Sequence, residues 1–281
     1  MTARPPYGVI GYGAIGRVLV AELAKTGGGI ELPLLVRAKY LDEARSEVPP
    51  GVEVHSTAEA FLACRPEAVI EAAGAGAVAE IAESVFEADA DLVVASASAL
   101  TDDALYGRIA AMAQARGRQA VVASGALGSL DILAAMAAAG LHSVTYRGVK
   151  PPAAWRDTPA EKVCDLESLT SATAFFSGSA REAAQSFPKN ANVAALVGFA
   201  GLGLDGTRVE LVADPNAVAN RHEVVAMGET GEMRFEVAGK AAQGNARTSA
   251  TTAYSLLEAA RSRSSPIVIG TSRARDYRHA R

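Results

Sequence analysis

The sequence has few of the residues and runs that mark several large classes of protein. Its 281 residues include two cysteines, one tryptophan and four histidines. Cys64 and Cys164 lie far apart, with no CxxC or Cys/His ligand spacing, so we expect reduced thiols and no metal site. No run reaches the roughly 18 uninterrupted apolar residues of a membrane span, and the first residues lack a signal peptide's apolar stretch. We therefore expect a cytoplasmic protein.

An excess of basic charge is also absent. Lys and Arg number 27 against 31 Asp and Glu, which gives a net charge of -4 and a pI near 5.7. Binding to a phosphate backbone needs a basic face, so we expect no nucleic-acid or membrane partner. The hydrophobic share of 49% and the charged share of 21% are ordinary for a globular protein. The length allows two domains, each with its own core.

The first half alternates apolar runs of strand length with helical patterns. The runs cover residues 7–10, 32–36, 68–72, 91–96 and 119–124. Strands without polar alternation, separated by helices, indicate a parallel sheet covered on both faces. Two helices are expected to begin at caps, one at Ser56 in a capping box with Glu59, the other at Thr101. Residues 1–125 are therefore predicted to form a Rossmann-type, doubly wound dinucleotide-binding domain.

The second half changes its period. Apolar and polar residues alternate in residues 142–149, 207–213, 221–227 and 232–238. Such alternation is typical of antiparallel strands with one wet face. Residues 126–244 are thus predicted to form an α+β substrate domain with a mainly antiparallel sheet. A C-terminal helix at about 245–264 is expected to pack back onto the first domain. The predicted fold class is α/β with this second domain.

A glycine loop follows the first predicted strand. Gly11, Gly13 and Gly16 fit the pattern G-x-G-x-x-G, with Ala14 and Ile15 opening a helix. The glycines allow a tight turn, close approach to a pyrophosphate and close helix packing. The helix N-terminus offers free N–H groups to the phosphates. Because the motif stands in the first strand–turn–helix of an α/β pattern, it predicts NAD or NADP binding by these five residues.

The carboxylate that usually holds the adenosine ribose is missing after the second strand. Arg37 stands there with Lys39 close by, and an Arg can pair with the 2′-phosphate of NADP. The alternative is a solvated Arg at a strand end. Two loops of small residues, 72–77 and 96–101, are expected to approach the same cofactor, with Ala73 in contact, although both can also be simple turns.

Beyond residue 120, the chain resembles a known family of enzymes. Four segments carry the resemblance: ASGALGSLDIL (123–133), FFSGSAREAAQSFPKNANVAA (175–195), VELVADPNAVANRHEV (209–224) and GNARTSATTAYSLLEAA (244–260). Together they resemble L-aspartate dehydrogenases. The resemblance implies reversible oxidative deamination of L-aspartate to iminoaspartate, which hydrolyses to oxaloacetate and ammonia, with a place in NAD biosynthesis.

The resemblance also implies roles for single residues. His222 matches the family's catalytic histidine, and Ala126 and Asn192 match cofactor contacts. A histidine that titrates near neutrality can take a proton from the substrate ammonium and activate water for attack on the imine. We therefore expect His222 to be a general acid/base that titrates in this range.

Aspartate carries two carboxylates, which need cations or convergent N–H donors. Lys189 and Asn190 precede an apolar helix, and we expect them to contact the substrate. The reserve candidates are Lys150, Arg147, Thr170, Ser171 and Thr173. His55 and His279 look like surface residues, and His142 is expected near a strand start. A homodimer is also expected.

Two other functions remain open from the sequence. The chain could be a related NAD(P)-dependent reductase of another small amino or hydroxy acid. It could instead be a sensor that binds NAD(P) without catalysis. His222 and Lys189 favour the enzyme.

Overall fold

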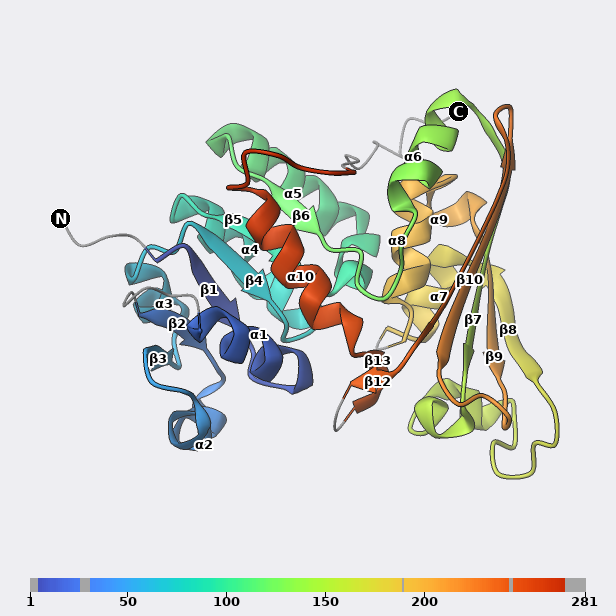
Figure 1. Cartoon of the computed structure of the whole chain (residues 1–281), viewed down its shortest axis with the longest axis horizontal. Helices are drawn as coiled ribbons and strands as arrows, with labels where there is room; N and C mark the ends of the chain where they lie inside the picture. The colour runs from blue at the N-terminus through green and yellow to red at the C-terminus, as the bar shows by residue number, and fades with distance from the viewer. Residues whose placement is uncertain (1–4, 26–30, 189, 243–244, 271–281) are drawn as a thin grey trace. The chain divides into compact units, whose positions relative to one another are not determined.

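A computed structural model describes residues 5–25, 31–188, 190–242 and 245–270 (Figure 1). Contacts within it divide the chain into two compact units. Unit 1 holds the residues up to Ala123 together with Thr252–Ser265, and unit 2 holds Ser124–Thr251. Among the described residues, no helix is long and apolar enough to cross a membrane.

The sheet of unit 1 is parallel and six-stranded, in the order β3-β2-β1-β4-β5-β6. This is the strand order of the Rossmann fold, in which the order of strands along the sheet changes direction between β1 and β4 while the strands stay parallel. Its strands are β1 (Tyr7–Ile10), β2 (Leu32–Leu35), β3 (Val52–His55), β4 (Ala68–Glu71), β5 (Asp91–Val94) and β6 (Ala120–Val122). The predicted parallel sheet is confirmed, and β3 is a strand that the apolar runs did not reveal, because it alternates as an edge strand does.

Helices cover both faces of this sheet. They are α1 (Ala14–Ala24), α2 (Leu41–Glu47), α3 (Ala58–Ala63), α4 (Ala75–Glu87), α5 (Asp103–Arg116) and α10 (Thr251–Ser262). On one face, Leu256 and Leu257 of α10 share a buried cluster with Leu19 of α1 and Val9 of β1. On the other face, α3, α4 and α5 contact one another in sequence. The C-terminal helix therefore completes the core of unit 1.

Three predicted helix starts need correction. The cap of α3 is Thr57, whose side chain accepts from the N–H of Ala60, and not Ser56. The cap of α5 is Asp102, which accepts from two backbone N–H groups, and not Thr101. The C-terminal helix was predicted from about residue 245, but β13 (Asn245–Ser249) pairs with β12 (Ala241–Ala242) and the helix begins at Thr251. Thr and Ser favour strands and caps over helix interiors, which explains the later start.

Unit 2 is built on a five-stranded sheet in the order β11-β10-β7-β9-β8. Its strands are β7 (Leu141–Lys150), β8 (Thr173–Ser179), β9 (Arg208–Ala213), β10 (Asn220–Gly228) and β11 (Gly231–Gly239). Only β7 and β9 run parallel within it, so the expected mainly antiparallel sheet is confirmed. Burial alternates along β10, which gives one wet face and one covered face.

The helices of unit 2 lie on one side of this sheet (Figure 1). They are α6 (Leu130–Ala139), α7 (Ala180–Ser186), α8 (Asn192–Ala200) and α9 (Gly203–Gly206), and 3₁₀ helices span Pro152–Trp155 and Pro159–Lys162. Ser179 and Glu182 form a capping box at the start of α7, since each side chain accepts from the other's backbone N–H. The even-numbered residues of β7 and β10 point to the helix-covered face, which places His222 inside the unit.

Candidate active site

The glycine loop of unit 1 needs its glycines for steric reasons. Gly11 has φ +95°, and a Cβ there would lie 2.8 Å from the Ala72 carbonyl oxygen. A Cβ on Gly16 would lie 2.0 Å from the Gly11 carbonyl oxygen, so α1 could not pack against the strand end. Gly13 is exposed and has open space around its missing Cβ. The first and third glycines serve the fold, and the second leaves room for a ligand.

The N-terminus of α1 is suited to a phosphate. Gly13 is its cap residue, no side chain caps it, and its first turn contains no acid. Ala14 opens the helix, while Ile15 is partly buried against the core cluster of unit 1. The cap residue of α4, Gly74, likewise provides no side-chain hydrogen bond, and the first turn of α4 contains no acidic residue. Uncapped N–H groups and helix dipoles favour an anion, so these residues fit a dinucleotide pyrophosphate.

A buried carboxylate fixes the two neighbouring loops. Glu71, at the end of β4, is fully buried. One of its oxygens accepts from the N–H groups of Ala73 and Gly74, each at 2.7 Å, and the other from those of Ala95 and Ser96 at 3.2 and 3.1 Å. The Ser96 hydroxyl donates as well. Glu71 thus sets the shape of both small-residue loops. No sequence pattern pointed to this residue, because Glu71 stands inside an apolar run.

Arg37 lies where the sequence analysis placed it, after the carboxyl end of β2. It is exposed, and its guanidinium lies 5.0 Å from the ring centre of Tyr40. The Lys39 ammonium lies 4.8 Å from the same ring. Both cations therefore flank one aromatic ring at the strand end, which concentrates positive charge where an acidic residue commonly binds the ribose.

In unit 2, a glycine in β7 makes room for the hydrogen bond that positions His222. His222 of β10 pairs with Gly148 of β7. Tyr146 and Lys150, two residues to either side of Gly148, are its diagonal neighbours on the same face. A Cβ on Gly148 would lie 2.7 Å from the Tyr146 hydroxyl. The glycine therefore lets this hydroxyl pass over β7 and reach Nδ1 of His222 at 2.8 Å, with the two rings nearly parallel.

The protonation of His222 differs from the sequence-based expectation. Its side chain is buried, and burial, reinforced by the charge of Lys150, lowers its pKa to about 3. Burial therefore disfavours the charged imidazole at neutral pH, in contrast to the titration near neutrality expected from the sequence. Burial also raises the pKa of Tyr146, which keeps its phenol protonated. Nδ1 of His222 and this hydroxyl share one hydrogen bond, in which either group can be the donor, because a hydroxyl both donates and accepts.

Other polar groups are buried near this pair. Lys150 is 3% exposed and its ammonium lies 5.3 Å from the Trp155 ring centre. Asn190, predicted as a substrate contact, is buried and donates from Nδ2 to the carbonyl of Ala154 at 3.1 Å. Its Oδ1 is buried without a hydrogen-bond partner among the described residues. A buried unpaired acceptor and a buried cation are costly for stability, which is expected where a polar ligand binds.

The remaining predicted contacts lie on loops and at a helix start. Ala126 is half-buried in the turn between β6 and α6, where the N–H of Leu127 bonds the carbonyl of Ser124. Asn192 is the first residue of α8, whose N-terminus has no side-chain cap and no acid in its first turn. Lys189 lies outside the described residues.

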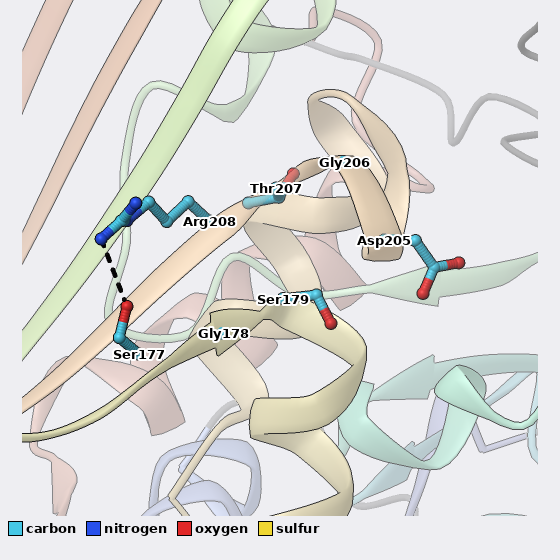
Figure 2. A pocket seen from close by; sticks show the side chains of 7 residues that line it. All are labelled: Ser177, Gly178, Ser179, Asp205, Gly206, Thr207 and Arg208. Atoms are coloured by element: carbon cyan, nitrogen blue, oxygen red, sulfur yellow. Dashed lines mark hydrogen bonds between the residues drawn. The ribbon is translucent and has the colours of Figure 1, made fainter.

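A small open pocket of about 250 Å³ occurs elsewhere in unit 2 (Figure 2). Its lining comes from the end of β8, from α9 and from the start of β9, with Arg208 donating to the Ser177 hydroxyl at 3.3 Å. The start of β9 lies beside Thr145, whereas Gly148 pairs with Leu211. The start of β9 is therefore about 10 Å from the level of His222 along the strand direction, and neither His222 nor Tyr146 lines the pocket.

Comparisons with known proteins agree with this division. Residues 11–123 match a family model described as "Homoserine dehydrogenase, NAD binding domain", and residues 131–263 match "Aspartate dehydrogenase, C-terminal". The strand order and glycine loop, joined to that C-terminal model, define an NAD(P)-dependent amino-acid dehydrogenase. The chain uses NAD or NADP.

Similar proteins narrow the class to one family. The chain is 43% identical to an L-aspartate dehydrogenase of Ruegeria pomeroyi over 92% of each chain. It is 41% identical to that of Cupriavidus taiwanensis over 93% of this chain and 98% of the relative. The aspartate dehydrogenase structure from Thermotoga maritima matches with a TM-score of 0.74 and 25% identity, over 95% of this chain and all of the other. The chain belongs to the L-aspartate dehydrogenase family.

Glu71→Gln should destabilise the protein and weaken cofactor binding. The amide would turn an NH₂ group toward backbone donors, and losing one charged hydrogen bond costs about 1.5–3 kcal/mol. Urea unfolding and NADPH fluorescence titration measure the two effects. Glu80→Gln, on the exposed face of α4, is the matched control and should change neither. Equal behaviour of the two variants would show that Glu71 does not hold the loops.

His222 should make the protein less stable as the pH falls. Its pKa is about 3 when folded and 6.5 as the ordinary value, so between these pH values only the unfolded chain takes up the proton. The contribution is fully present above the unfolded pKa. From about pH 6 to about pH 5, the free energy of unfolding should fall by about 1 kcal/mol more than in His222→Asn. Urea titrations at both pH values measure this, and parallel falls would contradict it.

Proposed function

We propose that the chain catalyses the reversible oxidative deamination of L-aspartate. Its similarity over nearly the whole length to relatives named L-aspartate dehydrogenase carries the proposal. When bound, the cofactor supplies a hydride acceptor, C4 of its nicotinamide ring. Aspartate loses one hydride from Cα and one proton from its ammonium group, which yields iminoaspartate. Addition of water then gives oxaloacetate and ammonia.

The glycine loop and its helix bind the pyrophosphate in this proposal. Open space at Gly13, the uncapped start of α1 and the loop containing Ala73 support it. Arg37 binds the adenosine ribose end and tolerates a 2′-phosphate, which makes NADP a substrate alongside NAD. Ala126 and Asn192 also contact the cofactor in this proposal, as the family resemblance implies.

The substrate's two carboxylates need positive groups. Lys150 supplies a buried ammonium next to His222, close enough to lower the pKa of the imidazole. The uncapped start of α8 supplies N–H groups, and the unpaired Oδ1 of Asn190 can accept from the substrate ammonium. A dicarboxylic amino acid offers complementary groups for each of these, which supports aspartate over a neutral amino acid.

His222 is the general acid/base in the proposal, and bound substrate makes it a usable base. A pKa of about 3 is too low for efficient proton transfer at neutral pH. The negative charge of a bound dicarboxylate offsets Lys150 and favours the imidazolium, which raises the pKa. The substrate thus creates the base that its own ammonium group requires.

Tyr146 positions His222 and can keep its hydrogen bond to the ring in each protonation state of the imidazole. When Nε2 carries the ring hydrogen, the Tyr146 hydroxyl donates to Nδ1. When Nε2 acts as the base, or when both nitrogens are protonated, Nδ1–H donates to the same hydroxyl oxygen, since a hydroxyl is both donor and acceptor. One residue therefore keeps the ring in place while its proton moves.

His222→Asn should lower kcat by about 10²–10⁴-fold, the range for lost acid–base catalysis, with NADPH affinity nearly unchanged. Tyr146→Phe should lower it by about fivefold, since one net hydrogen bond is worth about 1 kcal/mol. The assay follows reduced nicotinamide absorbance with L-aspartate, and in reverse with oxaloacetate and ammonia. His142→Asn, exposed and paired with Glu229, is the control and should keep full activity.

The same assay separates the other functions. Turnover of a different keto acid with no turnover of oxaloacetate would replace aspartate as substrate. NADPH binding with no turnover of any amino or keto acid would favour a sensor. Unchanged turnover in His222→Asn would remove this residue from the chemistry while leaving the family assignment intact.

Arg37→Asp should shift cofactor use from NADP toward NAD. The new carboxylate repels a 2′-phosphate and can accept from a ribose hydroxyl. The ratio of kcat/KM for NADP to that for NAD should fall by at least about tenfold, equivalent to 1.4 kcal/mol. Arg45→Asp, exposed on α2, is the control for net charge. If both variants move the ratio equally, Arg37 does not contact the cofactor.

A further inference from the structure

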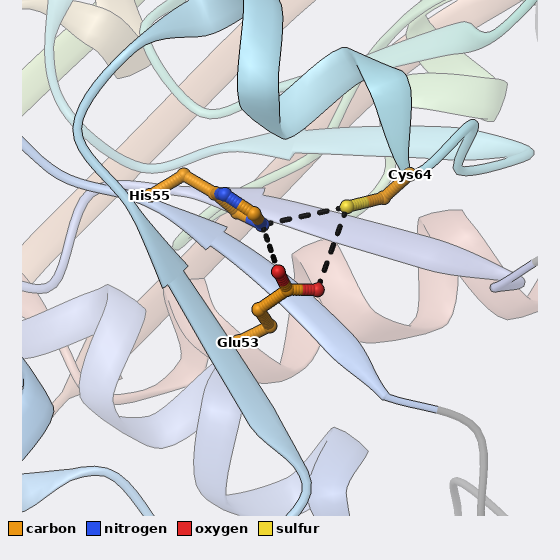
Figure 3. Close-up of side chains that lie close together, drawn as sticks. All are labelled: Glu53, His55 and Cys64. Atoms are coloured by element: carbon orange, nitrogen blue, oxygen red, sulfur yellow. Dashed lines mark hydrogen bonds and ion pairs between the residues drawn. The ribbon is translucent and has the colours of Figure 1, made fainter.

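The edge of the parallel sheet in unit 1 brings together three side chains of different chemistry. Glu53 and His55 are two apart on β3, so both point to the same face of the sheet. Val54 points to the opposite face, where it joins the core cluster of α1 and α10. Cys64 caps the C-terminus of α3, which covers the face that Glu53 and His55 share. Figure 3 shows the three side chains pointing toward one another.

The separations of their polar atoms match those of ligands around a single ion. Cys64 Sγ lies 3.4 Å from His55 Nε2 and 3.7 Å from Glu53 Oε2, and His55 Nε2 lies 3.6 Å from Glu53 Oε1. Zinc bonds of about 2.3 Å to sulfur and about 2.0–2.1 Å to nitrogen and oxygen, at tetrahedral angles, separate such atoms by about 3.3–3.6 Å. The three ligands therefore need only small movements to share one ion.

The donor set selects the kind of ion. A thiolate, an imidazole and a carboxylate are the ligands of Zn²⁺ and similar transition metals, whereas Ca²⁺ and Mg²⁺ require oxygen ligands. The Cys64 thiolate and the Glu53 carboxylate together carry two negative charges, which a divalent ion balances. The set thus suits Zn²⁺ in both softness and charge.

Of the three residues, His55 is held in place by its surroundings and Glu53 is open to solvent. The side chain of His55 is 10% exposed and its ring packs edge-on against Phe61, so it is not the surface residue that the sequence suggested. The side chain of Glu53 is 50% exposed. An ion can therefore enter past the carboxylate and keep water as its fourth ligand.

We propose that Glu53, His55 and Cys64 form a Zn²⁺ site. The ion ties the edge strand β3 to the end of α3. The ion also helps to hold the backbone next to Arg37 in place, because the His55 carbonyl accepts from the N–H of Val36 at 2.9 Å. The site lies within unit 1, involves none of the residues assigned to proton transfer, and does not depend on the identity of the substrate.

The experiment uses full-length protein without a polyhistidine tag, freed of metal by a chelator. Co²⁺ serves as the spectroscopic probe, since a cobalt–thiolate bond gives a charge-transfer absorption in the near ultraviolet. Wild-type protein should show this band at one equivalent of Co²⁺, and added Zn²⁺ should remove it. Zn²⁺ should also raise the thermal unfolding midpoint and protect Cys64 from alkylation, as mapped by mass spectrometry.

Two pairs of variants provide the controls. Cys64→Ser should abolish the band, whereas Cys164→Ser should retain it. Glu53→Gln should weaken Co²⁺ binding by at least tenfold, whereas Glu59→Gln, also exposed and near the site in sequence, should not. Glu53 is half exposed, so its variant tests the site even if Cys64→Ser fails to fold. A missing band in folded wild-type protein, or a band that survives loss of Cys64, overturns the proposal and leaves a hydrogen-bonded cluster only.

Discussion

The hydrogen bond between the Tyr146 hydroxyl and Nδ1 of His222 depends on a position with no side chain. Any Cβ at Gly148 would occupy the place through which that hydroxyl passes. The bond fixes the ring of a buried imidazole whose pKa is lowered by that burial. Because Lys150 lies on the other side of the same glycine position, one strand supplies both the hydroxyl that orients the imidazole and a charge that adds to the effect of burial on its pKa.

In unit 1, a buried carboxylate likewise fixes the positions of the groups around it. Glu71 is buried at the end of β4, and its oxygens gather N–H groups from the loops that follow β4 and β5. The loops themselves consist of small residues with little capacity to hold their own shape. A single charged side chain thus organises the edge of the sheet while leaving the helix N-termini uncapped for a phosphate.

The sequence predicted the regular parts of both units and missed several groups that surround the site. Apolar runs indicated five of the parallel strands, and alternation indicated the strands that carry Tyr146 and His222. Glu71 was hidden in one of those runs, and Tyr146 looked like one more apolar residue on an alternating strand. The caps Thr57 and Asp102 each lie one residue from the predicted position, because neighbouring Ser, Thr and Asp side chains are all capable of capping. The last helix begins at Thr251 because strand β13 precedes it.

Local spacing and residue type were enough to predict the glycine loop, the two kinds of sheet and the family. The tertiary structure decided which side chains meet. The register of β10 against β7 sets His222 between Tyr146 and Lys150, and burial there moves its pKa far from neutrality. The meeting of His55 with Cys64 likewise requires α3 to fold over β3. Pairing and desolvation depend on how whole strands and helices pack against one another, so no local pattern encodes them.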